Sequence, residues 1–169
     1  LVATGALSQG DIGRTAAYWW TGDAIGVLIM FPLAASLLFD RKTPPPRRPA
    51  QLLPLLCASV VTAIVFLFVD ATKQGAHAFQ YLIFPFVAWG AITMSTAQVA
   101  SMNLVVAALA IFGTALGHGP YAATASPGDI WLLQAFVSAV AATSLLLKGA
   151  IEDRRRSEHR RQEFERRFR

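Results

Sequence analysis

The residues from Tyr18 to Phe39 form an apolar run that contains one carboxylate, Asp23. The run is long enough to cross a membrane, since about 20 helical residues span a hydrocarbon core of about 30 Å. A carboxylate about one turn inside such a helix costs roughly 3 kcal/mol unless it is paired or hydrated. Asp23 could therefore respond to protons or bind a ligand near the outer face. The alternative, which is the commoner role, is a structural carboxylate that bonds backbone N–H groups around Gly22.

Other polar and aromatic residues in the apolar runs extend this set of candidates. Trp19 and Trp20 begin the first run, where amphipathic rings favour the membrane–water boundary. Asn103 and Gln134 lie inside later runs and could bond across helices, which contributes roughly 1 kcal/mol each. For Trp89, packing is the commoner role. The candidate ligand-binding or sensing residues are Trp19, Trp20, Gly22, Asp23, Gly26, Trp89, His118 and Gln134.

Few other residues could do chemistry. A single cysteine, Cys57, excludes a disulfide framework or a thiolate metal site within the chain, and we interpret it as a packing residue. His77 and His118 are expected in loops outside the membrane, and no third ligand has the spacing for a metal site. The sequence contains no nucleotide-binding glycine loop and no HExxH motif, and its three scattered histidines do not predict a serine–histidine pair. The sequence therefore predicts neither enzymatic chemistry nor a metal site in this stretch.

The composition indicates a polytopic membrane protein with an all-α fold. Of the 169 residues, 54% are hydrophobic and 15% are charged, which is far from the average of soluble proteins. Apolar runs lie at about 18–39, 51–69, 79–116 and 130–148. A single helix over 79–116 would be nearly twice as long as the membrane core is thick, so this run must fold as a hairpin. We predict the turn at its most polar point, 95–98, and hence a bundle of about five membrane helices.

The basic residues predict which ends of these helices face the cytoplasm. Of the 15 Lys and Arg residues, nine lie in 148–169, four lie in 41–48, and the other two are Arg14 and Lys73. Five crossings place Arg14 and Lys73 on one side and the remaining cations on the other, which the positive-inside rule makes the cytoplasmic side. This distribution is typical of helix ends beside anionic lipid, so we expect the bilayer as a partner and no nucleic acid.

The sequence changes character after the last apolar run, where a charged, helix-permissive segment begins. Residues 151–169 contain eight Arg and five acidic residues but neither Gly nor Pro. Phe164 and Phe168 are spaced i, i+4 and so share one helix face. We expect a membrane domain over 1–150 and a cytoplasmic helical signalling linker over 151–169. The residues expected to relay a signal are Ile151, Phe164 and Phe168.

Four segments together resemble the type-one membrane-associated sensor (MASE) domain of bacterial receptors. WWTGDAIGVLIMFP at 19–32 resembles the family's W-x-GD-x-x-G-x-L-x-x-x-P signature, and YLIFPFVAWGAI at 81–92 resembles its F-P-x-x-x-W-A-A segment. GHGPY at 117–121 is similar to the family's G-x-G-P-F/Y loop. LLQAFVSAVAATSLLLKGAIEDRRR at 132–156 is similar to its closing helix, L-Q-x-F with a run into E-x-R-R. Four motifs in the right order are much more specific than any one of them.

The resemblance covers about residues 10–156, which correspond to the C-terminal portion of the family's domain. It implies that the chain is truncated at its N-terminus and belongs to a longer receptor. The resemblance further implies a sensory input followed by a cytoplasmic output, either a histidine kinase or a GGDEF or EAL domain of cyclic di-GMP signalling, often after a PAS domain. It identifies neither a ligand nor a cofactor. One departure is ThrMetSer at 93–95, where the family tends to carry an Arg-Phe-Gly turn, so no role of that arginine carries over.

The resulting hypothesis is the sensory module of a bacterial inner-membrane receptor, whose last helix relays a stimulus to a covalently linked output domain, within a homodimer. Two alternatives stay open. The first is a small transporter or channel with Asp23 as its coupling carboxylate, although the spans show no internal repeat of the kind common in transporters. The second is a passive membrane anchor, which no sequence feature excludes.

Overall fold

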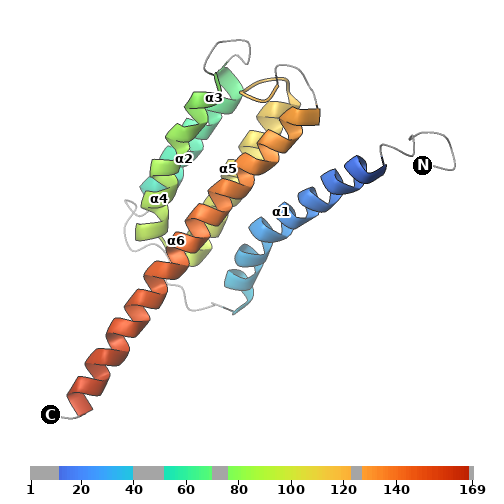
Figure 1. Cartoon of the computed structure of the whole chain (residues 1–169). Helices are drawn as coiled ribbons and strands as arrows, with labels where there is room; N and C mark the ends of the chain where they lie inside the picture. Colours follow the sequence, from blue (N-terminus) through green and yellow to red (C-terminus); the bar gives the residue numbers. More distant parts are fainter. Residues whose placement is uncertain (1–11, 40–51, 70–75, 123–126, 168–169) are drawn as a thin grey trace.

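The computed structural model describes residues 12–39, 52–69, 76–122 and 127–167, which are helical apart from short turns (Figure 1). The expected all-α fold is confirmed. The elements are α1 (Ile12–Phe39), α2 (Leu53–Ala63), the π-helical segment η3 (Ile64–Phe68), α3 (Ala76–Phe79), the 3-10 segment η4 (Gln80–Ile83), α4 (Phe84–Thr93), α5 (Thr96–Ala115) and α6 (Pro127–Arg167).

In the described residues, these elements form five passes of alternating direction through one bundle (Figure 1). Three helices, α1, α5 and α6, are long and apolar enough to cross a membrane. Two shorter apolar stretches, Leu53–Phe68 and Gln80–Thr93, form the other passes. α5 contacts α1, α2, α4 and α6, and α4 also packs against α2 and α6. α1 lies at the edge of the bundle, packed on α5 and α6 (Figure 1).

A buried stripe along α5 forms the middle of the core. Val99, Met102, Val106 and Ala110 are all buried, and they recur three or four residues apart. This spacing places them on one face of the helix. The same helix carries small residues such as Ala107, which allow neighbouring helices to approach closely.

The hairpin predicted within 79–116 is present, and its chain reversal lies at Met94 and Ser95. Met94 ends α4 with an extended backbone, and Ser95 is the N-cap of α5. Ser95 Oγ accepts a hydrogen bond from the Gln98 N–H, and Gln98 Oε1 accepts one from the Ser95 N–H at 2.9 Å. This capping box contributes about 1 kcal/mol. The prediction of a turn at 95–98 was therefore about one residue too late, because three of these four residues already belong to α5. The sequence signal for the start of α5 is a serine followed three residues later by a glutamine, and it needs neither Gly nor Pro.

At the opposite end of the bundle, α5 and the loop that follows it pack directly on η3. A Cβ atom on Gly113 would lie 2.3 Å from the backbone oxygen of Phe66, and one on Gly119 would lie 3.0 Å from Phe66 Cα. Gly119 also has a φ of 82°, which L side chains rarely adopt, and its N–H donates to Val69 O at 3.2 Å. These two glycines let the chain close over η3, which gives a physical reason for the second glycine of GHGPY. We call the end of the bundle that contains η3 and Gly119 the loop end, and we call the end that contains Met94 the tail end.

α6 is a single helix of 41 residues, which makes it about 60 Å long, roughly twice the thickness of a membrane core. Its C-terminal part extends beyond the bundle (Figure 1). Every residue from 153 to 165 is exposed. The segment predicted to be helical after the last apolar run is helical as far as Arg167, and it continues α6 without a break.

Candidate functional site

A pocket between α1, α5 and α6 brings together two of the predicted candidates, Gly22 and Gln134. Its volume is about 250 Å³. Gly22 contributes no side chain, and a Cβ atom there would lie 3.8 Å from Gln134 Nε2, so a larger residue would occupy the space. We call this cavity the α1–α6 pocket, and its lining residues are Gly22, Ile25, Ile111, Ile130, Leu133, Gln134 and Val137.

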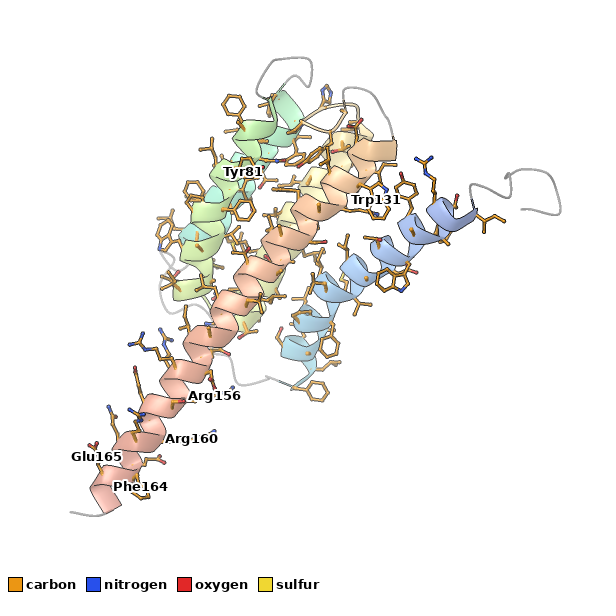
Figure 2. All side chains as sticks on the ribbon, in the orientation of Figure 1. Tyr81, Trp131, Arg156, Arg160, Phe164 and Glu165 are labelled. Carbon is orange, nitrogen blue, oxygen red and sulfur yellow. The ribbon has the colours of Figure 1, made fainter. Side chains whose placement is uncertain are left out.

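Gln134 is the polar side chain of the α1–α6 pocket, and it reaches toward α1. Its Nε2 lies 3.5 Å from the backbone oxygen of Tyr18, at the long limit for a hydrogen bond. Its Oε1 is buried and has no hydrogen-bond partner among the described residues. A second contact between the same helices pairs the rings of Tyr18 and Trp131, whose centroids lie 4.9 Å apart. Figure 2 shows Trp131 on the side of α6 toward α1. The expected cross-helix bond of Gln134 is therefore formed by only one end of its amide.

The other predicted candidates do not line this pocket. Trp19 and Trp20 are 72% and 73% exposed, and Asp23 is exposed as well. These residues lie on the part of α1 that α5 and α6 leave uncovered. Gly26 has no atom within 4 Å of the position of a Cβ atom. The two remaining candidates, Trp89 on α4 and His118 in the loop after α5, are also exposed. Sensing roles for these residues stay predictions.

At the tail end, polar contacts join α6 to the α4–α5 turn. We call the residues that form them, Met94, Thr96, Lys148 and Glu152, the tail-end cluster. The Lys148 side chain is 7% exposed, and its Nζ donates to Met94 O at 2.6 Å. The same Nζ lies 3.4 Å from Glu152 Oε1, which accepts a hydrogen bond from Thr96 Oγ1 at 2.9 Å. A cation suits this position because the C-terminal end of α4 carries the negative end of the helix dipole. α6 is thereby bonded to both sides of the hairpin turn.

A buried hydrogen bond joins α5 and α6 between these two ends. Asn103 Nδ2 donates to Ser144 Oγ at 2.7 Å, and both side chains are buried. The Ser144 hydroxyl can in turn donate to the backbone oxygen of Ala141, 3.0 Å away. The prediction that Asn103 bonds across helices is confirmed. Such a bond contributes roughly 1 kcal/mol and sets the register of the two helices.

At the loop end, α6 rests on an aromatic cluster. The ring centroid of Phe136 lies 5.4 Å from that of Phe66 and 6.4 Å from those of Phe84 and Tyr121. The Tyr121 hydroxyl donates to Gln80 Oε1. Burial raises the pKa of Tyr121 to about 12, so the phenol stays protonated and can donate at neutral pH. α6 is therefore held by ring packing at the loop end and by hydrogen bonds at the tail end.

The predicted relay residues lie where α6 leaves the bundle and beyond. Ile151 is half-buried beside the tail-end cluster, and Phe164 is 65% exposed near the far end of the helix (Figure 2). Between them, Arg154 Nε lies 3.1 Å from Glu158 Oε1 in an exposed ion pair that adds little stability. Phe168 lies outside the described residues, so the shared face of Phe164 and Phe168 stays a prediction.

The tail-end cluster is the feature that sequence reasoning missed. The charge pattern assigns Lys148 to the basic tail. However, Lys148 ends an apolar run and Glu152 follows four residues later, and this spacing predicts an ion pair between them on one helix face. Thr96 and the backbone oxygen of Met94 give no such signal, because their partners lie more than 50 residues further along the chain. Among the described residues, no three His, Cys, Asp or Glu side chains are grouped so that they could hold a metal ion.

Comparison with known proteins places most of the chain in one family. The family model described as MASE1 matches residues 1–155. No curated protein and no solved structure matches the chain.

Proposed function

The chain belongs to the MASE1 family, and from this premise we propose that it relays a stimulus from its membrane bundle through α6 to a cytoplasmic output domain. MASE1 domains are membrane sensor domains typical of bacterial signalling receptors. The stretch is accordingly a multi-pass membrane domain and is not itself catalytic. The resemblance found in the four sequence motifs is thereby confirmed.

The observation that carries the relay proposal is the continuity of α6. This one helix lines the α1–α6 pocket, bonds through Lys148 to the α4–α5 turn, and extends past the bundle to Arg167. A change in packing at the loop end can therefore reach the extension without crossing a flexible joint. A relay of this kind requires two arrangements of the bundle whose balance the stimulus shifts.

We propose that the α6 extension lies in the cytoplasm, at the inner membrane of a bacterium. The C-terminal end of α1 and the beginning of α2 lie at the tail end of the bundle (Figure 1). These ends flank the basic segment 41–48 in the sequence, and the arginines of α6 follow Lys148 beyond the same end of the bundle. The positive-inside rule supports a cytoplasmic tail end.

We also propose how the extension is used. Residues 151–169 would act as a signalling linker to a histidine kinase or a cyclic di-GMP enzyme, directly or through a PAS domain. Two copies of the receptor would place their extensions side by side, with apolar positions such as Phe164 at the seam. The membrane domain over 1–150 would supply the input.

A receptor in which residues 1–169 are joined to a diguanylate cyclase domain tests the relay. Inserting two residues after Asp153 would rotate the rest of α6 by about 200°, whereas inserting seven would nearly restore its phase. We expect the two-residue insertion to change cellular cyclic di-GMP several-fold and the seven-residue insertion to leave it near the starting level. If both insertions give the starting level, α6 acts as a loose tether and the relay proposal is wrong.

A further inference from the structure

Glu152 joins α6 to the hairpin turn at the point where the helix leaves the bundle. Its Oε1 accepts a hydrogen bond from Thr96 Oγ1 at 2.9 Å and lies 3.4 Å from Lys148 Nζ. Thr96 is the first residue of α5, so this carboxylate links the base of the α6 extension to another helix. The Glu152 side chain is 37% exposed, and a carboxylate that water reaches can leave its partners at small cost.

A second set of partners for Glu152 lies on its own helix. Arg155 and Arg156 follow it by three and four residues, and side chains at these spacings are neighbours on a helix surface. Both arginines are exposed, and neither forms an ion pair with another described residue. Figure 2 shows Arg156 on the part of α6 just past the bundle. These two cations are therefore available to Glu152 when it leaves Thr96.

Lys148 makes this change of partner a change of the whole tail-end cluster. Its side chain is 7% exposed, its Nζ donates to Met94 O, and Glu152 is the one carboxylate that pairs with it among the described residues. A buried cation that loses its carboxylate is strongly destabilised. When Glu152 turns to the arginines, Lys148 would therefore carry its ammonium group outward along its flexible stem toward water. The hydrogen bonds to Met94 O and from Thr96 would then be lost together.

We propose that Glu152 is a switch with two positions. In the bound position, which the structure shows, it contacts Thr96 and Lys148 and α6 is joined to the α4–α5 turn. In the released position it pairs with Arg155 or Arg156, and the base of the α6 extension is free to shift. This inference rests on the proposed relay, which requires two arrangements of the bundle, and it assigns them to one carboxylate at the tail end.

The test measures hydrogen exchange at the amide of Val99, in the whole chain in lipid nanodiscs. This amide donates to Ser95 O at 2.9 Å in the first turn of α5, so it opens when the α4–α5 turn loosens. Thr96→Val keeps the shape of the side chain but deletes the hydroxyl that holds Glu152. We expect exchange at Val99 to become about fivefold faster, the effect of one net hydrogen bond on the balance between the two positions.

Removing the partners of the released position should have the opposite effect. In the double variant Arg155→Gln and Arg156→Gln, Glu152 has no cation on the extension side, so the bound position gains population. We expect exchange at Val99 to become about twofold slower, the effect of one exposed helical ion pair. Opposite directions in the two variants are expected whichever position activates an output domain.

Arg160→Gln with Arg161→Gln is the matched control for the loss of two cations. These arginines are exposed as well, but they begin about 12 Å further along the helix than Glu152. This variant should exchange at the wild-type rate, and so should Arg155→Lys with Arg156→Lys, which keeps both charges. Unchanged exchange in Thr96→Val, or equal slowing in the two glutamine pairs, would overturn the proposal.

The same variants in a receptor fused to a diguanylate cyclase domain separate the switch from the relay. Shifts of exchange in opposite directions, with opposite changes in cellular cyclic di-GMP, would support both. The same shifts with unchanged cyclic di-GMP would support the switch and contradict the relay. If exchange does not shift as expected, the switch is wrong, and the relay through α6 is judged by the insertion experiment alone.

Discussion

Replacing Gly113 by alanine is expected to lower the free energy of unfolding by about 3 kcal/mol. The new Cβ atom would lie 2.3 Å from the backbone oxygen of Phe66 and 2.9 Å from its carbonyl carbon. Backbone atoms of a packed helix cannot move aside as the tip of a flexible side chain can. α5 and η3 would have to move apart, and this shift would weaken the contacts of the Phe66 ring with Tyr121 and Phe136. Unfolding in bicelles, followed by near-ultraviolet circular dichroism, measures the loss.

Two other glycines separate this steric effect from the general consequences of adding a methyl group. Gly26→Ala should raise the free energy of unfolding by up to about 1 kcal/mol, because alanine favours a helix interior over glycine and a Cβ atom there meets nothing within 4 Å. Gly117→Ala should cost about 1 kcal/mol, since Gly117 has a φ of 80° but open space around it. If Gly113→Ala is as stable as Gly26→Ala, the close contact between α5 and η3 is absent from the folded protein.

Replacing Lys148 by methionine should lower the free energy of unfolding by about 2 kcal/mol, the usual contribution of a hydrogen bond to a charged group. The variant keeps a side chain of similar length but leaves Met94 O, at the C-terminal end of α4, without its donor. The ion pair with Glu152 adds little to this figure, because the Glu152 side chain is 37% exposed. The α4–α5 turn should loosen, so the amide of Val99, which donates to Ser95 O, should exchange its hydrogen faster.

Arg154→Met provides the matched control for this prediction. Arg154 also pairs with a glutamate four residues later, but both side chains are well exposed. Its loss should change stability by less than about 0.5 kcal/mol and leave the exchange of Val99 unaltered. Equal effects of the two substitutions would mean that the α4–α5 turn is not held by α6.

The sequence was sufficient to predict the five passes of this bundle, because length and charge constrain membrane helices strongly. A run such as 79–116 cannot be one helix in a bilayer, so the hairpin follows from its length and the absence of charge. The helical extension follows from a charged segment that lacks Gly and Pro. The irregular segments η3 and η4 were not predicted, since apolar residues of the same kind also form regular helix.

The candidate site was predicted only in part, because the sequence does not show which face of a helix is covered. Gly22 and Gln134 were both candidates, and the structure brings them together across α1 and α6. Asp23 follows Gly22 directly but does not line the α1–α6 pocket, because adjacent residues lie about 100° apart around a helix. The hydrogen bond from Lys148 to Met94 O could not be predicted, since every residue has a backbone oxygen and the residue type does not show which one accepts.

The most direct test of the account measures cyclic di-GMP from the receptor that joins residues 1–169 to a diguanylate cyclase domain. We propose that the packing of α1 against α6 sets the output through α6. Gly22→Leu places a side chain against Gln134 and is expected to change the output several-fold at equal receptor abundance, while Gly13→Leu, where a Cβ atom meets nothing within 4 Å, leaves it at the wild-type level. An unchanged output in Gly22→Leu would contradict the account, and the bundle would then be a passive anchor.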